Sequence, residues 1–128
     1  MARLAEMELP QTREGESHHG EALAEVTDGI VRLFRESYGR GPTRAKSYLL
    51  DDRYVVTVLR DTMTTVERTL VDSGHIHLVR TVRLTFQEAM AASFKEVVEQ
   101  AVGRRVASYH SQLMTDPDMG VEFFLLED

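Results

Sequence analysis

Apolar residues in two long segments of the chain recur with the spacing of an amphipathic helix. The first segment begins at Glu21 and ends before Gly39, because glycine readily adopts the left-handed conformation that follows a helix. Its apolar stripe consists of Leu23, Val26, Ile30, Leu33 and Phe34. The second segment covers about Ile76 to Val102 and closes at Gly103. At about 1.5 Å per residue, this second helix is long enough to cross a domain of this size.

Four further segments have the composition of β-strands and form two successive pairs. Asp51-Asp52 joins the first pair, and a turn containing Pro117 joins the second. The predicted strands are Arg44 to Leu50, Arg53 to Arg60, Arg105 to Met114 and Met119 to Leu126. We expect each pair to form an antiparallel hairpin.

Two local patterns refine this prediction. The pair Thr64 and Glu67 forms a capping box, which predicts a short helix to about Val71. On the last strand, alternate positions are all apolar, and we expect their common face to lie in the core. These positions are Met119, Val121, Phe123 and Leu125.

The order helix, strand, strand occurs twice, and Gly-Arg precedes each hairpin, as Gly39-Arg40 and as Gly103-Arg104. This weak internal repeat predicts an α+β two-layer sandwich, in which helices cover one face of a four-stranded antiparallel sheet. The predicted order of elements is α-β-β-α-α-β-β. Residues 21–128 form the single domain, and residues 1–20 form a mobile acidic segment. The order of strands within the sheet stays open at this stage.

Composition and motifs exclude several classes of function. The 128 residues include no cysteine, so disulfides and thiolate chemistry are excluded, and the formal net charge is −6. The absence of a long apolar run or a secretory signal predicts a cytoplasmic protein without direct membrane insertion. Phosphate-binding glycine motifs and nucleophile elbows are missing, which disfavours an enzyme and predicts no cofactor. An acidic chain without interleaved aromatic and basic residues also disfavours nucleic acid.

The histidines and paired aspartates do not have the spacing of a metal site. No histidine has a second one three or four residues away, the spacing that places two imidazoles on one helical face. Asp51-Asp52 and the pair Asp116 and Asp118 fall where hairpin turns are expected, and aspartate is common in turns. We therefore predict no metal site.

A cationic region stands out against the acidic total. Between Arg32 and Arg60 there are seven Lys and Arg but only three Asp and Glu. Strand alternation places Arg44, Lys46 and Tyr48 on one face, and the repeat places His110 on the matching face of the third strand. The candidate binding residues for a small anion or an acidic partner are Arg40, Arg44, Lys46, Tyr48 and His110. The alternative is a solvated outer face of the sheet.

Several strings in the chain together resemble a known family. They are residues 30–42, which end in Tyr38-Gly39-Arg40-Gly41-Pro42, then Ala45 and Tyr48, Glu67 to Leu70, Phe86 to Met90 and Gly103 to Val106. The chain resembles, over about residues 21–128, the MpsC-like bacterial family, formerly a domain of unknown function. This family is named for the C component of a sodium-translocating, membrane-potential-generating system. The resemblance implies a link to a membrane system for cation transport and inorganic-carbon supply, without catalytic residues to carry over.

Two functional hypotheses follow. The first is a non-enzymatic accessory protein that binds a protein partner, such as a membrane transport complex, through the cationic strand face or the long helix. The second is a binding or sensor domain for a small anion or ligand. Apolar residues beyond one stripe of the long helix also predict a homodimer. These residues are Leu78, Leu84, Met90 and Val98.

Overall fold

The described chain forms helices and strands in the predicted order α-β-β-α-α-β-β. The computed structural model describes the backbone of residues 2–128 and the side chains of residues 19–128. Its elements are α1 (Ala2–Ser37), β1 (Arg44–Leu50), β2 (Tyr54–Arg60), α2 (Thr65–Asp72), α3 (Ile76–Val102), β3 (Val106–Thr115) and β4 (Asp118–Leu126). The α+β fold class is confirmed, and the strand bounds differ from the predicted ones by about one residue.

Helix α1 starts earlier than the pattern predicted. It begins at Ala2, although the apolar stripe begins at Leu23. Residues 2–20 of the predicted mobile acidic segment, residues 1–20, therefore coincide with the first part of α1. The side chains of residues 1–18 lie outside the described residues, and the mobility of this segment stays a prediction.

Local sequence chemistry explains where the elements begin and end. The Thr64 hydroxyl accepts from the Glu67 N–H while the Glu67 carboxylate accepts from the Thr64 N–H, so the predicted capping box is confirmed. Gly39 and Gly103 follow α1 and α3 with φ of 80° and 74°, a conformation that glycine adopts without strain. Asp51 and Asp52 have φ of 53° and 51°, and aspartate tolerates this region in a tight hairpin turn.

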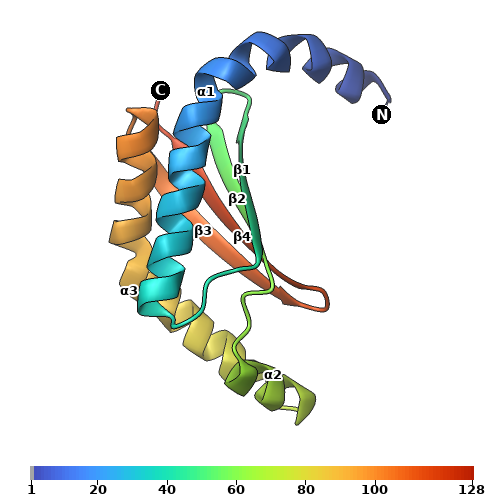
Figure 1. The fold of residues 1–128 in the computed structure, drawn as a ribbon, viewed down its shortest axis with the longest axis vertical. Coiled ribbons are helices and arrows are strands. Elements are labelled where there is room, and N and C mark those ends of the chain that lie inside the picture. Colours follow the sequence, from blue (N-terminus) through green and yellow to red (C-terminus); the bar gives the residue numbers. More distant parts are fainter. Residues whose placement is uncertain (1) are drawn as a thin grey trace.

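The four strands form one antiparallel sheet in the order β1-β2-β4-β3. The two hairpins therefore meet through β2 and β4 at the centre, and β1 and β3 are the two edges. Figure 1 shows α1 and α3 side by side against one face of the sheet, with α2 projecting at one end. The other face of the sheet carries no helix among the described elements.

The core lies between the sheet and the two long helices. Three fully buried residues of this core are Ile30 from α1, Phe94 from α3 and Phe124 from β4. The two helices approach closely at Gly29, where an added Cβ atom would lie 2.5 Å from Cγ1 of Val97. Glycine is therefore required at this helix crossing because any side chain would collide with α3.

The prediction for the buried face of β4 is wrong. The face that contacts the helices carries Gly120, Glu122, Phe124 and Leu126, all of them buried. The all-apolar set of Met119, Val121, Phe123 and Leu125 lies on the opposite face and is half-buried. The physical reason is Glu122, whose carboxylate is 2% exposed but accepts hydrogen bonds from Tyr109 and Ser111 on β3. A carboxylate whose hydrogen bonds are satisfied can lie on the core face of a strand. The alternation of apolar and polar residues along the strand does not reveal such a carboxylate.

Candidate functional site

The open face of the sheet is an apolar stripe with a cationic edge. The strand register places Tyr48, Val56, Phe123 and His110 in one row across β1, β2, β4 and β3. The neighbouring rows are Arg44, Arg60, Met119 and Met114, then Lys46, Val58, Val121 and Gln112, and finally Leu50, Tyr54, Leu125 and Ser108. The two central strands thus contribute mainly apolar side chains, and no carboxylate stands in these rows. We call this set of residues the open sheet face.

The predicted cationic residues gather at the β1 edge of the open sheet face. Arg44 pairs with Arg60 across the hairpin, and the Lys46 ammonium lies 5.3 Å from the centre of the Tyr48 ring. Arg40 lies beyond the end of β1, where its Nε donates to the Asp61 carbonyl over 3.1 Å. Arg44, Lys46 and Tyr48 are therefore neighbours, as strand alternation predicted, and Arg40 lies close to the same end of the sheet.

His110 does not join this group. It lies on the open sheet face, as the internal repeat predicted, but on β3 at the opposite edge. Strands β2 and β4 lie between β1 and β3, so the two edges are three strand spacings apart. At about 4.8 Å per spacing, this distance is about 14 Å. The five candidate residues therefore do not surround a single small ligand.

A buried ion pair, which the sequence analysis did not identify, connects the helices at the α2 end of the molecule. Nε and Nη2 of Arg83 donate to the two carboxylate oxygens of Glu67 over 2.7 and 2.8 Å, and both side chains are about 6% exposed. Nη2 also donates to the Thr62 carbonyl over 2.9 Å. The Tyr38 hydroxyl donates to the same carboxylate, and its ring lies 4.4 Å from the guanidinium. The signal in the sequence was Arg83 itself, an arginine at a position of α3 where helical spacing from Val79 predicts a buried apolar side chain.

The charges of this ion pair stabilise each other. Burial alone would raise the pKa of Glu67, but hydrogen bonds from Arg83, Tyr38 and the Thr64 N–H outweigh it and lower the pKa. Burial likewise opposes the charged form of Arg83, and the hydrogen bond and charge of Glu67 raise its pKa. Burial and the hydrogen bond to Glu67 raise the pKa of Tyr38 to about 12. These groups stay fixed in charge near neutral pH, so this cluster has the properties of a structural clamp.

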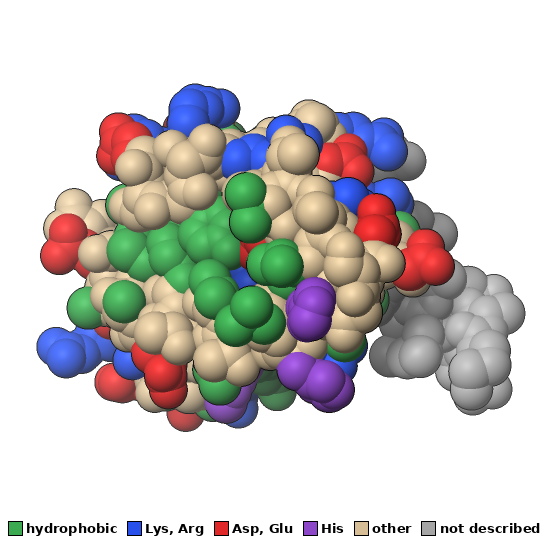
Figure 2. Space-filling model, turned by 90° about the horizontal axis from the view of Figure 1, so that it is seen from below, with side chains coloured by type: hydrophobic (Ala, Val, Ile, Leu, Met, Phe, Trp, Pro, Cys, Tyr) green, Lys and Arg blue, Asp and Glu red, His purple; other side chains and the backbone are tan. Residues whose placement is uncertain are grey.

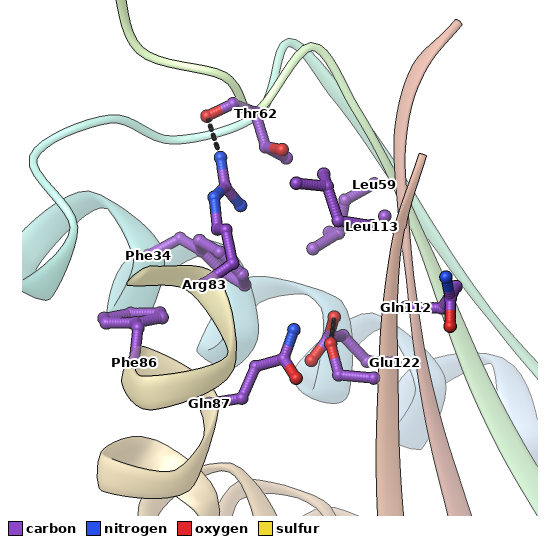
Figure 3. Close-up of a pocket in the computed structure, with 11 residues that line it drawn as sticks. Phe34, Leu59, Thr62, Arg83, Phe86, Gln87, Gln112, Leu113 and Glu122 are labelled. Atoms are coloured by element: carbon purple, nitrogen blue, oxygen red, sulfur yellow. Dashed lines mark hydrogen bonds between the residues drawn. The ribbon is translucent and has the colours of Figure 1, made fainter. Parts of the chain in front are cut away.

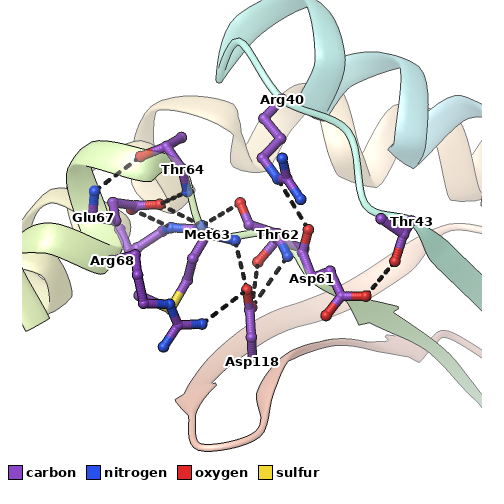
Figure 4. Close-up of polar contacts among 10 residues, drawn as sticks. Arg40, Thr43, Asp61, Thr62, Met63, Thr64, Glu67, Arg68 and Asp118 are labelled. Carbon is purple, nitrogen blue, oxygen red and sulfur yellow. Dashed lines mark hydrogen bonds and ion pairs between the residues drawn. The ribbon is translucent and has the colours of Figure 1, made fainter. Parts of the chain in front are cut away.

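Asp118 ties the β3–β4 turn to the segment between β2 and α2 (Figure 4). Its carboxylate accepts from the Thr62 and Met63 N–H groups over 3.1 and 3.0 Å, and Arg68 of α2 lies 3.6 Å away. Asp61 at the end of β2 accepts from the Thr43 hydroxyl. The Asp118 carboxylate thus satisfies two backbone donors of the segment between β2 and α2, which gives it a structural role.

Glu122 is the second buried acid that the sequence analysis did not identify. Figure 3 shows its carboxylate beside a small cavity between α3 and the sheet, lined also by Arg83, Gln87 and Phe86. The cavity has a volume of about 10 Å³, which is room for about one water molecule. Burial raises the pKa of Glu122, although hydrogen bonds from Ser111 and Tyr109 and the charge of Arg83 oppose this shift. Burial and the neighbouring Glu122 also raise the pKa of Tyr109.

The raised pKa of Glu122 predicts a specific pH dependence of stability. Between the unfolded pKa of 4.5 and the raised folded value, the folded state holds one more proton than the unfolded state. The contribution of Glu122 to the free energy of unfolding is therefore fully present below pH 4.5. It falls as pH rises through the folded pKa of Glu122. Glu122→Gln removes this loss because the amide stays neutral. We expect its unfolding free energy, relative to that of the unmodified chain, to increase from pH 4.5 to 8.

Urea unfolding of both proteins at four pH values between 4.5 and 8 measures this difference. Parallel curves would show that Glu122 holds no extra proton in the folded state. A variant that becomes relatively less stable at high pH would reverse the sign and contradict the argument.

Exposed apolar side chains also occur on the helices. Val66 of α2 is 68% exposed, and Leu78, Val82 and Leu84 of α3 are between 46% and 57% exposed. Viewed from the α2 end, the molecule presents a cluster of hydrophobic side chains, with histidines next to it (Figure 2). Val98 and Met90, which the sequence analysis assigned to a second exposed surface, instead lie in or against the core. Leu78 and Leu84 are exposed as that prediction requires.

Within residues 19–128, no group of three or more His, Asp or Glu side chains is arranged to hold a metal ion. No helix of the described residues is both long enough and apolar enough to span a membrane. The structure thus defines a two-layer α+β domain with an open, partly apolar sheet face.

The family model for the Na⁺-translocating membrane potential-generating system (MpsC) matches residues 18–128. The chain belongs to this family. No curated protein and no solved structure matches it at a significant level. Family membership is consistent with an association with a membrane sodium-transport system.

Proposed function

We propose that the chain is a non-enzymatic cytoplasmic accessory protein of a sodium-translocating membrane system, and that it binds a protein partner through the open sheet face. The observation that carries this proposal is the composition of that face. Its two central strands carry apolar side chains, including Val56, Val121 and Phe123. No helix among the described elements covers this face of the sheet. Contiguous apolar surface with a polar rim is typical of protein interaction sites.

The cationic edge indicates what kind of partner fits. Arg44 and Lys46 lie on the edge strand β1, and Arg60 lies beside Arg44 at the end of β2. No carboxylate in the rows of the open sheet face neutralises them. A partner surface with apolar side chains and acidic residues along one side is complementary to it. Such charges mainly steer association and fix orientation, while the apolar stripe contributes most of the affinity.

The alternative of a small-anion sensor receives less support from the geometry. The β1 cations and His110 lie at opposite edges of the sheet, so they do not converge on one ligand. The small cavity beside Glu122 has room for about one water molecule and is lined by a carboxylate. We therefore favour a protein partner.

Reversal of the β1 charges tests this proposal. In Arg44→Glu/Lys46→Glu, acidic groups of the partner would face new acidic groups, and we expect a loss of about tenfold or more in affinity. The measurement is co-purification with the solubilised membrane components of the sodium-translocating system, followed by titration of the captured partner.

The matched control is Arg80→Glu/Arg105→Glu, which reverses the same number of exposed charges on α3 and before β3. We expect the control to retain binding. Equal binding by both variants, or an equal loss in both, would overturn the assignment to the open sheet face.

The proposal includes self-association. Exposed apolar residues on α3 support a homodimer, because Leu78 and Leu84 would be partly covered in it. Light scattering of the full chain that returns one chain mass would contradict this part alone and leave the partner-binding proposal intact.

A further inference from the structure

An apolar stripe crosses the open sheet face diagonally. It covers β1, β2 and β4 in the row of Leu50, and it covers β4 and β3 in the row of Met119. Each row of the stripe is two or three side chains wide, and the remaining positions of the row are polar. The members of this diagonal stripe, row by row, are Leu50, Tyr54 and Leu125, then Tyr48, Val56 and Phe123, then Val58 and Val121, and finally Met119 and Met114.

The side chains of the diagonal stripe lie against one another but stay accessible. The rings of Tyr54 and Phe123 are 5.6 Å apart, and both residues are half-buried. Tyr48 and Leu50, at the β1 end of the stripe, are 41% and 49% exposed. In Figure 1 the helices of the described chain all lie on the other side of the sheet or beyond its end. A second surface that covers the stripe would therefore remove apolar side chains from water.

The dimensions of the diagonal stripe are those of one helix. Its four rows span the seven residues of β2, which is about 20 Å at 3.3 Å per residue. Two strands are about 10 Å wide, and this is the diameter of an α-helix with its side chains. A helix covers 20 Å with about 13 residues. A second sheet would instead need an apolar face across all its opposing strands, and the polar flanks do not offer one.

The two flanks of the diagonal stripe differ in charge. On the flank towards β1 the polar side chains are Arg44, Lys46 and Arg60, all of them cationic and exposed. On the flank towards β3 they include His110 and Gln112, and no Lys, Arg, Asp or Glu occurs in this strand. A helix that lies on the stripe therefore meets cations along one side only. Acidic side chains on that side of the helix are complementary to them.

The cations also lie towards one end of the stripe. Arg44 and Arg60 form the last row, whereas the row of Leu50 at the other end carries no charge. Near the cationic end, the carboxylates of Asp61 and Asp118 already accept hydrogen bonds from residues of this chain. Because the C-terminus of a helix carries partial negative charge, a helix on the stripe is favoured with its C-terminus at the Arg44 and Arg60 end.

We propose that the diagonal stripe binds one amphipathic helix of the partner protein, with its C-terminus at the Arg44 and Arg60 end and acidic side chains on the flank towards β1. This inference rests on the proposed partner-binding function and specifies the segment that the partner contributes. The bound helix would cover the sheet face opposite α1 and α3. A second copy of this chain fits less well, since its open sheet face brings the same cations and no carboxylate.

Cross-linking from both ends of the stripe tests this arrangement. The sequence contains no cysteine, so Met119→Cys and Leu125→Cys each provide one site for a benzophenone label on the full chain. Both positions lie on β4, six residues and about 20 Å apart. Each labelled chain is irradiated with the solubilised membrane components of the sodium-translocating system, and the cross-linked residues of the partner are mapped by mass spectrometry. We expect the two cross-links about 13 residues apart, with the one from Met119→Cys nearer the partner's C-terminus.

The spacing of the cross-links separates the outcomes. An extended segment would place them about six residues apart, and this spacing would overturn the helix but leave the partner-binding proposal intact. The reverse order along the partner would overturn the assigned direction. If no protein is cross-linked and the chain sediments with vesicles of phosphatidylglycerol and phosphatidylcholine, the stripe binds a lipid surface instead. The control is Gln100→Cys on α3, an exposed position in the helix layer, which should not label the same segment.

A pair of variants in one row tests the acidic flank without a label. Lys46→Gln and Gln112→Glu each lower the charge by one, on opposite sides of the stripe. We expect Lys46→Gln to weaken binding of the captured partner about fivefold and Gln112→Glu to change it less than twofold. Equal effects of the two variants would contradict the assigned flank. If Arg44→Glu/Lys46→Glu also binds normally, the partner-binding proposal itself fails.

Discussion

Glu67→Gln is expected to lower the free energy of unfolding by about 3–5 kcal/mol at pH 7. The substitution leaves the Arg83 guanidinium buried at 5% exposure without a charged partner. Glutamine keeps the capping box because its amide oxygen still accepts from the Thr64 N–H. The loss in free energy of unfolding therefore measures the removal of the Glu67 charge and not the loss of the capping box. Urea unfolding measured by circular dichroism at one protein concentration gives the value, since self-association would make stability depend on concentration.

Two further variants separate the contributions. Tyr38→Phe removes only the hydroxyl donor to Glu67 and should cost about 1 kcal/mol. Glu67→Gln/Arg83→Met removes both charges, keeps the acceptor for the Thr64 N–H and should recover most of the loss, because a buried charge is costly only when it lacks its partner. A loss below about 1 kcal/mol in Glu67→Gln would show that the pair is not buried as described.

The pH dependence of the Glu67→Gln effect has a defined sign. Glu67 has a folded pKa below its unfolded value of 4.5, so its stabilisation is present above that pH. It is lost as pH falls through the folded pKa. The difference between the two proteins should therefore be constant from pH 6 to 8 and shrink below pH 4.5. This is opposite to the behaviour expected for Glu122→Gln.

Phe94→Ala is expected to have a comparable effect, about 3–5 kcal/mol. Phe94 is fully buried at the centre of the core, and its ring lies 5.6 Å from the ring of Phe34 on α1 and 5.9 Å from that of Tyr109 on β3. Its removal opens a cavity where both long helices meet the sheet. Lost contacts on three elements cannot be regained by moving one of them.

The matched control is Leu78→Ala on the same helix. Leu78 is 51% exposed, so its truncation should change the free energy of unfolding by no more than about 0.5 kcal/mol. Equal losses in Phe94→Ala and Leu78→Ala would contradict the described packing of α3. Both measurements use urea unfolding under identical conditions.

The sequence by itself determined the local structure of this protein. Helical spacing placed α3, the capping box at Thr64 placed the start of α2, and the turn aspartates and glycines placed the ends of hairpins and helices. These signals are predictive because each depends on neighbours a few residues away in the chain. Strand alternation also placed Arg44, Lys46 and Tyr48 together on one face, since residues two apart on a strand always share a face.

Only the tertiary structure decided which of these elements meet. The order β1-β2-β4-β3 separates His110 from the cations of β1, and it leaves β3 as an edge. Glu67 and Arg83 are 16 residues apart, and their pairing depends on how α2 docks against α3. The buried face of β4 was decided by the partners of Glu122 on β3 and not by the hydrophobicity of β4 itself. A polar group can be buried wherever another element satisfies its hydrogen bonds, and such contacts between distant segments exist only in the folded chain.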